Sequence, residues 1–152
     1  MRTEITLNMP SDMSTLPLVR HITRQVMCEL GVEVGCVDDV ELALAEACAN
    51  VVEHARTHGG YEVEIDITDG NCSLRVVDRG RGFDYQSLGG TSAADTTPAD
   101  RGRGITLMEA LVDLATFQSR PEAGTVVTLV KKLSFQPGTP GDRLGGPRAG
   151  TT

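Results

Sequence analysis

The chain has 152 residues, 39% of them hydrophobic and 23% charged, which suits one globular domain with a buried core. Its formal net charge of −7 argues against nucleic acid as the main partner, because phosphate binding needs a basic surface. No apolar run reaches the length of about 18 residues expected of a membrane span. The N-terminus has no secretion signal, so we expect a cytoplasmic protein.

The cysteines do not form a recognisable metal or redox motif. Cys28, Cys36, Cys48 and Cys72 include no CxxC pair, and no histidine lies at metal-ligand spacing. We expect reduced thiols that pack as small apolar residues.

The first third of the chain predicts one strand and two helices. Residues 3–9 alternate in polarity, which favours a strand with one buried face. A helix begins near Pro17 and ends at Gly31, and its apolar stripe comprises Leu16, Val19, Ile22, Val26 and Leu30. Residues 36–55 predict the clearest helix, with an apolar stripe of Val37, Val40, Leu44, Cys48 or Ala47, and Val51.

Residues 61–77 predict a β-hairpin. Tyr61, Val63, Ile65 and Ile67 alternate, and Asp69-Gly70 or Gly70-Asn71 supplies the tight turn before the returning strand. Residues 84–103 are small, polar and too long for a simple connection, which predicts a lid or a plain disordered loop.

The remaining regular elements are a helix and a second strand pair. Residues 104–114 predict a helix with Ile105, Met108 and Leu111 or Val112 facing inward, and residues 115–120 and 124–132 predict strands. Pro and Gly supply eight of the sixteen residues from 137 to 152. We therefore expect a domain over 1–133 and a disordered tail over 134–152.

This order of elements predicts an α/β two-layer sandwich. Two helices precede a hairpin, and a third helix precedes another pair of strands, which is not a βαβ alternation. We expect a mixed or antiparallel sheet of about five strands, covered on one face by about three helices.

Two motifs carry carboxylates at positions where they could take part in catalysis or ligand binding. Glu46 and Asn50 are four residues apart on the predicted helix and share one face, although alone they could be a solvated face. Asp78 ends a strand and is followed by Gly80 and Gly82, which allow close backbone approach to a ligand. An acid at a strand end can accept a hydrogen bond from an exocyclic amine, but the motif could also be a tight turn.

A third motif suits anion binding. Gly102, Arg103 and Gly104 lead into a helix, where free N–H groups and the helix dipole favour phosphate, although a simple hinge is the alternative. The loop lacks the GxxxxGK[ST] pattern of a P-loop. Gly124-Thr125 opens the last strand and alone indicates only a turn.

Taken in order, these motifs resemble the N, G1, G2 and G3 boxes of GHKL ATPases, which have the Bergerat ATP-binding fold. EACANVVEHA, VVDRGRGFD, RGRGITLMEALVD and SRPEAGTVVTL resemble anti-sigma factor serine kinases of the RsbW and SpoIIAB type, over residues 3 to about 133.

The resemblance implies ATP and Mg²⁺ as ligands. It implies that Asn50 coordinates Mg²⁺ and that Glu46 is the general base toward the attacking hydroxyl. It also implies that Asp78 holds the adenine amine and that Thr125 lies on the adenine side.

The glycine-rich positions have implied roles as well. Gly80 and Gly82 would let the backbone pass close to the nucleotide, whereas Gly102, Arg103 and Gly104 would hold the phosphates.

The resemblance further implies partners. Such proteins phosphorylate a serine of an anti-anti-sigma protein of the STAS type, sequester a sigma factor and form homodimers. Arg20 is a candidate partner contact, although a solvated arginine is the simpler interpretation. Two alternatives remain: a non-catalytic ATP-binding module that sequesters a partner, or a GHKL kinase or ATPase with another acceptor.

Overall fold

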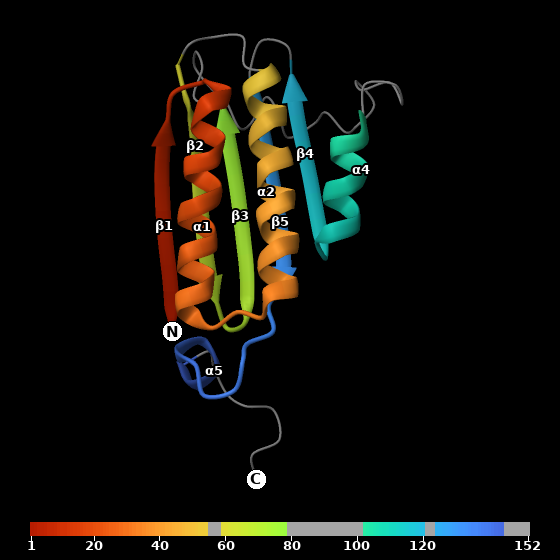
Figure 1. The fold of residues 1–152 in the computed structure, drawn as a ribbon. Coiled ribbons are helices and arrows are strands. Elements are labelled where there is room, and N and C mark those ends of the chain that lie inside the picture. Colours follow the sequence, from red (N-terminus) through yellow and green to blue (C-terminus); the bar gives the residue numbers. More distant parts are fainter. Residues whose placement is uncertain (55–58, 79–101, 121–123, 145–152) are drawn as a thin grey trace.

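A computed structural model of the protein describes residues 1–54, 59–78, 102–120 and 124–144. These residues form an α/β two-layer sandwich, with one five-stranded sheet whose one face is covered by α1, α2 and α4 (Figure 1). The predicted fold class is therefore confirmed. The strands are β1 (Arg2–Met9), β2 (Tyr61–Thr68), β3 (Asn71–Asp78), β4 (Leu114–Arg120) and β5 (Gly124–Lys132). The helices are a short 3-10 turn (Met13–Thr15), α1 (Leu16–Leu30), α2 (Val34–His54), α4 (Gly102–Leu111) and α5 (Pro140–Leu144).

The sheet has the strand order β1-β2-β3-β5-β4, and every neighbouring pair is antiparallel. The β2–β3 turn confirms the predicted hairpin, because Asp69 and Gly70 both have positive φ, at 50° and 79°. The pairing of β3 with β5 brings the end of β3 beside the start of β5. Strands from distant parts of the sequence therefore meet at one end of the sheet.

Helix α1 turns a slightly different side to the core than its apolar residues predict. Pro17 lies in its first turn, and Gly31 ends it with φ of 86°, as expected. Its buried residues are Val19, Thr23 and Met27, whereas Ile22 is only partly buried. Thr23 is tolerated in the core because its hydroxyl donates a 2.9 Å hydrogen bond to the carbonyl oxygen of Val19. Apolar identity alone was therefore an incomplete guide to the buried face.

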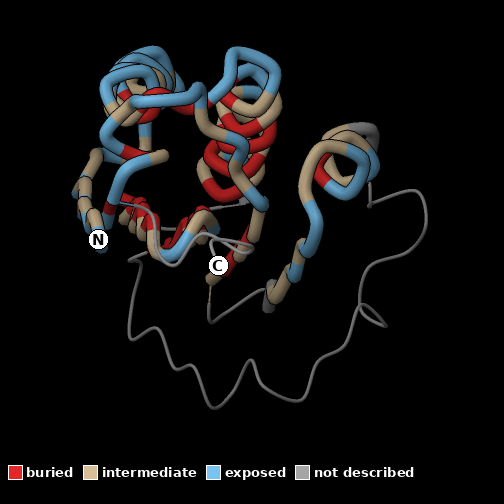
Figure 2. The backbone as a smooth tube through the Cα atoms, turned by 90° about the horizontal axis from the view of Figure 1, so that it is seen from below, coloured by how far each residue is buried: buried red, intermediate tan, exposed pale blue. Residues whose placement is uncertain are grey.

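Helix α2 supplies much of the core between the helices and the sheet. All of its predicted inward residues are at most 1% exposed: Val37, Val40, Leu44, Ala47, Cys48 and Val51. They pack in one cluster with the inward residues of β2, which include Val63, Ile65 and Ile67. Figure 2, viewed from below, shows the buried residues gathered between the helix layer and the sheet. None of the described helices is long and apolar enough to cross a membrane.

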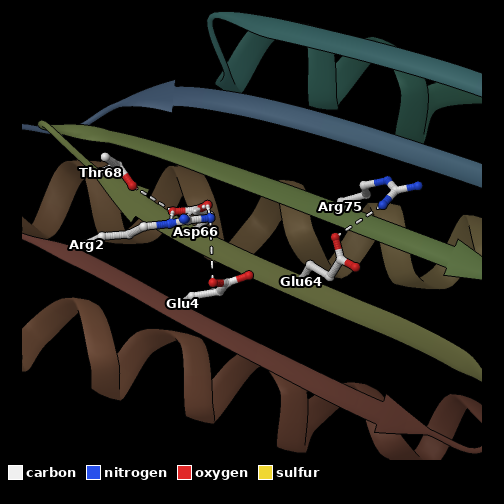
Figure 3. A network of polar contacts seen from close by, with 6 residues as sticks. All are labelled: Arg2, Glu4, Glu64, Asp66, Thr68 and Arg75. Carbon is white, nitrogen blue, oxygen red and sulfur yellow. Dashed lines mark hydrogen bonds and ion pairs between the residues drawn. The ribbon is translucent and has the colours of Figure 1, made fainter.

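The other face of β1, β2 and β3 carries a charged network (Figure 3). Arg2 contacts Asp66 at 2.8 Å, and Arg75 contacts Glu64 at 3.3 Å. These residues alternate along the strands with the buried residues that face the helices. The face opposite the helices is thus polar over these three strands.

The segment after β5 corrects one expectation. Phe135 pairs with Val32, α5 follows, and the terminal amine of Met1 donates a 3.0 Å hydrogen bond to the carbonyl oxygen of Leu144. Gly141 is buried where a Cβ would meet the Phe135 ring, so a glycine allows the close packing. The expected disorder from residue 134 is wrong for residues 134–144, because backbone hydrogen bonds from Glu33 to Ser134 and from Gln136 to Gly31 dock this segment beside the end of α1. Residues 145–152 lie outside the described residues.

Candidate functional site

The two polar residues of the predicted helix motif lie on one side of α2. Glu46 and Asn50 are one turn apart and partly buried, while Ala47 and Val51 beside them point into the core. Glu53, which the sequence pattern places near the same stripe, is exposed. Glu46 and Asn50 are therefore fixed by a well-packed helix and still accessible at its edge.

The start of α4 approaches the Glu46 carboxylate closely. A Cβ atom on Gly104 would lie 2.7 Å from Oε2 of Glu46, a separation that real side chains do not show. The helix begins at Gly102, two residues earlier than predicted, so both glycines belong to its first turn. The first turn of a helix carries N–H groups without helical partners, and these favour an anion. A helix start whose free N–H groups could bind an anion thus lies beside the Glu46 carboxylate.

Asp78 and Thr125 lie at the adjoining ends of β3 and β5. The last printed pair of these strands is Val77 with Val126, and Asp78 and Thr125 are the next residues on either side. Each is only 2% exposed, although both are polar. A buried carboxylate beside a buried hydroxyl is costly unless it has polar partners, so a polar environment is expected at this place.

These pieces share one end of the molecule. Figure 1 shows the end of α2, the end of β3 and the starts of α4 and β5 at the same end of the sandwich. Helix α2 packs against α4, β3 and β5. The structure thereby brings together five of the residues predicted from sequence: Glu46, Asn50, Asp78, Gly104 and Thr125.

Several predicted positions cannot be placed with them. Gly80, Gly82 and the lid segment up to residue 101 lie outside the described residues. Gly102 is placed as the first residue of α4, and the backbone of Arg103 follows it in the same turn.

Arg20 lies elsewhere, on α1. Its guanidinium pairs with Glu41 of α2 at 3.1 Å, and Arg24 pairs with the same carboxylate at 2.6 Å. Burial by itself raises the pKa of Glu41, but hydrogen bonds from Arg24 and Arg20 outweigh it and lower that pKa. Arg20 therefore contributes to the α1–α2 contact and not to the end of the sandwich described above.

Sequence reasoning missed Tyr61 as a neighbour of the site. Tyr61 pairs with Asp78 across β2 and β3, is 1% exposed, and its hydroxyl lies 2.7 Å from Oγ1 of Thr15. Thr15 donates its own proton to the carbonyl oxygen of Asp12, so Tyr61 is the donor to Thr15. The alternation of β2 already predicted an inward Tyr61, but only the register shows that Asp78 is beside it.

The side-chain oxygen atoms at this end suit a magnesium ion that is coordinated mainly by the phosphates of a bound molecule. Among the described residues no group of three or more His, Cys, Asp or Glu could hold a metal ion. Magnesium, however, takes few protein ligands and binds amide and carboxylate oxygens together with phosphates. Asn50, partly buried and one turn from Glu46, fits that requirement.

Comparison with known protein families gives an independent assignment. The histidine kinase-like ATPase domain family matches residues 9–131. This range contains both strand ends and both helix segments of the site.

Curated relatives match most of the chain. The serine-protein kinase RsbW of Bacillus velezensis is 28% identical over 139 residues, covering 86% of this chain and 86% of the relative. The anti-sigma F factor of Clostridium botulinum is 29% identical over 104 residues, covering 65% of this chain and 73% of the relative.

Solved structures support the same fold. The RsbU and RsbW domains of a Mycobacterium tuberculosis protein superpose with a TM-score of 0.65 at 24% identity, over 86% of this chain. This chain spans 32% of that longer chain. The SiaB–SiaC complex of Pseudomonas aeruginosa contains a chain that matches with a TM-score of 0.53 at 16% identity.

Proposed function

Because the chain belongs to the histidine kinase-like ATPase domain family, we propose that it is an ATP-dependent serine-protein kinase and anti-sigma factor. Curated relatives with these two names, serine-protein kinase and anti-sigma F factor, support the proposal. The arrangement of the site supports it as well, since one end of the sandwich offers separate positions for a base and for phosphates.

ATP would bind along this end of the sandwich. The buried pair Asp78 and Thr125 is suited to the adenine, with the carboxylate accepting from the exocyclic amine. Gly80 and Gly82, placed by sequence alone, follow Asp78 and would let the backbone pass close to the nucleotide.

The triphosphate would then extend toward the start of α4. The free N–H groups of the first turn, from Gly102 to Gly104, would donate to phosphate oxygens, and Arg103 would add positive charge. The amide oxygen of Asn50 would hold Mg²⁺, which when bound neutralises phosphate charge.

Glu46 would act as the general base. As the serine oxygen of the acceptor attacks the γ-phosphorus, Glu46 takes the hydroxyl proton, and the bond from that phosphorus to the oxygen of ADP breaks. This proposal rests on the close approach of Gly104 to Glu46. A Cβ atom added to Gly104 would lie only 2.7 Å from Oε2 of Glu46. This closeness supports the proposal because the carboxylate lies beside the first turn of α4, where phosphate would bind and a hydroxyl would approach.

The partners we propose are proteins. The acceptor is a serine of an anti-anti-sigma protein of the STAS type, and the sequestered partner is a sigma factor, which places the chain in the cytoplasm. We also propose a homodimer. Arg20, whose side chain is 47% exposed despite its pair with Glu41, is the proposed partner contact.

The experiment measures Mg-ATP binding by calorimetry and phosphate transfer from γ-labelled ATP to the anti-anti-sigma protein. Wild type is compared with Glu46→Gln and Asn50→Ala. We expect Glu46→Gln to retain ATP binding and to lose transfer by about 10²-fold or more. Asn50→Ala should weaken Mg-ATP binding and transfer together.

Glu109→Gln is the matched control, because Glu109 is an exposed acid of α4 outside the site. It should behave as wild type. Binding of ATP without transfer by wild type would leave a partner-sequestering module, and absence of ATP binding would contradict the proposal entirely.

A further inference from the structure

Helix α4 has few hydrophobic anchors of its own. It has ten residues, and Met108 is the only fully buried one among those of its side chains that the structure describes. Ile105 and Leu111 are partly buried against the core. Because little apolar surface is buried, polar contacts should contribute more to the position of α4 than to that of α2.

Lys131 supplies such a contact at the C-terminal end of α4. It pairs with Cys72 on the inward side of β5, in the alternation that also turns Val127 and Leu129 inward. Its Nζ donates a 2.8 Å hydrogen bond to the carbonyl oxygen of Leu111 and lies 3.2 Å from Oδ2 of Asp39 on α2. The last carbonyl groups of a helix lack helical partners and carry partial negative charge, so an ammonium group is stabilising there.

Two backbone contacts fix the same end of α4 to β5. The N–H of Asp113 donates to the carbonyl oxygen of Val130 at 2.9 Å, and the N–H of Lys132 donates to the Asp113 carboxylate at 2.7 Å. The residues just after α4 are therefore held at the far end of the sheet from the candidate site (Figure 1).

The two contacts between α4 and α2 have the same spacing along both helices. Asp39 and Glu46 are seven residues apart on one side of α2, and Gly104 and Leu111 are seven residues apart on α4. Each interval spans about two helical turns, or roughly 10 Å. The close approach of Gly104 to Glu46 and the Lys131 bridge from Leu111 to Asp39 therefore match an antiparallel arrangement of the two helices (Figure 1).

We propose that Lys131 is a positioning residue of the ATP site. By holding the end of α4 against Asp39, it sets where the first turn of α4 lies relative to Glu46. This inference rests on the proposed function, because its consequence is the placement of the phosphate-binding turn. Lys131 itself contacts Asp39 and Leu111, so it would act on the nucleotide only through α4.

The test compares Lys131→Met with Lys132→Met. Both remove one ammonium group from adjacent positions, but the Lys132 side chain is exposed on the opposite face of β5. We expect Lys131→Met to raise the Kd and KM for ATP about fivefold, which is less than the full strength of a charge-assisted hydrogen bond because Lys131 acts on the nucleotide only through α4. The KM for the acceptor protein should not change, and Lys131→Arg should restore ATP binding.

A second variant and a second measurement guard against an effect on folding alone. Asp39→Asn weakens the same bridge at a partly exposed position and should raise the Kd for ATP in the same direction. Hydrogen exchange of the ATP-free protein should show faster exchange for residues 105–111 in Lys131→Met, with α1 unchanged.

The outcomes separate the two proposals. Wild-type Kd and KM for ATP in both Lys131→Met and Asp39→Asn would overturn the positioning role. If wild type does not bind ATP, the proposed function fails, and hydrogen exchange alone decides whether Lys131 holds α4. Unchanged exchange over 105–111 would then overturn the inference, and a selective increase would support it.

Discussion

A Cβ atom on Gly104 would lie 2.7 Å from Oε2 of Glu46, so the first turn of α4 and the middle of α2 meet where only glycine leaves the carboxylate in place. A separation below 3.0 Å requires one of the two groups to move. The Glu46 side chain is flexible at its end, whereas the helix backbone is not. A side chain at position 104 would therefore displace the carboxylate before it displaced the helix.

Gly104→Ala should separate activity from stability. Alanine favours a helix over glycine by about 0.5–1 kcal/mol, so the free energy of unfolding should not fall. The displaced Glu46 carboxylate should lower kcat for phosphate transfer at least about tenfold. Urea unfolding and the kinase assay measure the two effects.

Gly35→Ala is the matched control for this substitution. Gly35 is a glycine of α2 with no atom near an added Cβ. It should keep wild-type kcat and gain stability. Wild-type kcat in Gly104→Ala would show that the position of the Glu46 carboxylate does not matter for transfer.

Asp78→Asn should weaken ATP binding at least about tenfold, because one accepting oxygen is replaced by an amide that donates. Asp78 is 2% exposed, so water cannot readily replace the lost contact. Calorimetry measures the Kd, and circular dichroism checks the fold. Asp69→Asn, an exposed change at the β2–β3 turn, should bind ATP as wild type does. Equal affinities for the two variants would remove Asp78 from the adenine site.

Glu41→Gln should destabilise the protein by about 1 kcal/mol at neutral pH, since it removes the charge that pairs with Arg24 and Arg20. The pKa of Glu41 is lowered from its ordinary value of 4.5 by folding. Its contribution is therefore complete above pH 4.5 and is lost as the pH falls through the lower folded value.

Urea unfolding from pH 7 to pH 3 measures this dependence. The difference between wild type and Glu41→Gln should shrink toward the acid end of the series. Glu29→Gln, an exposed change on α1, should show no such difference. A constant difference at all pH values would indicate that packing, and not charge, makes the Glu41 contribution.

The four cysteines should differ in reactivity toward iodoacetamide at pH 8. Burial raises the pKa of Cys48 and of Cys72 to about 12, whereas Cys28 is exposed. Mass spectrometry should find Cys28 labelled in the folded protein, and Cys48 and Cys72 labelled only in urea. Rapid labelling of Cys48 without urea would show that the inner side of α2 opens readily.

Much of the layout follows from local pattern. The Asp69-Gly70 turn and the alternation on either side of it determine the β2–β3 hairpin, because both depend only on neighbouring residues. The apolar stripe of α2 likewise determines its buried face and, by the same geometry, the accessible edge with Glu46 and Asn50. The motifs and their order also predicted the family.

Local sequence pattern did not predict burial or docking where these depend on particular hydrogen bonds. Thr23 is buried because its hydroxyl is satisfied within α1, and residues 134–144 dock through backbone hydrogen bonds to Gly31 and Glu33. Composition averages over such contacts, so a Pro- and Gly-rich segment was predicted to be disordered.

The sequence by itself determined the elements between residues 2 and 132, the inward faces of α2 and β2, and which residues are candidates for the site. Tertiary structure alone decided which of these residues meet: Gly104 with Glu46, Tyr61 with Asp78, and Lys131 with both Asp39 and Leu111. The physical reason is that strand register and helix packing are set by the whole core, over separations along the chain that no local periodicity spans.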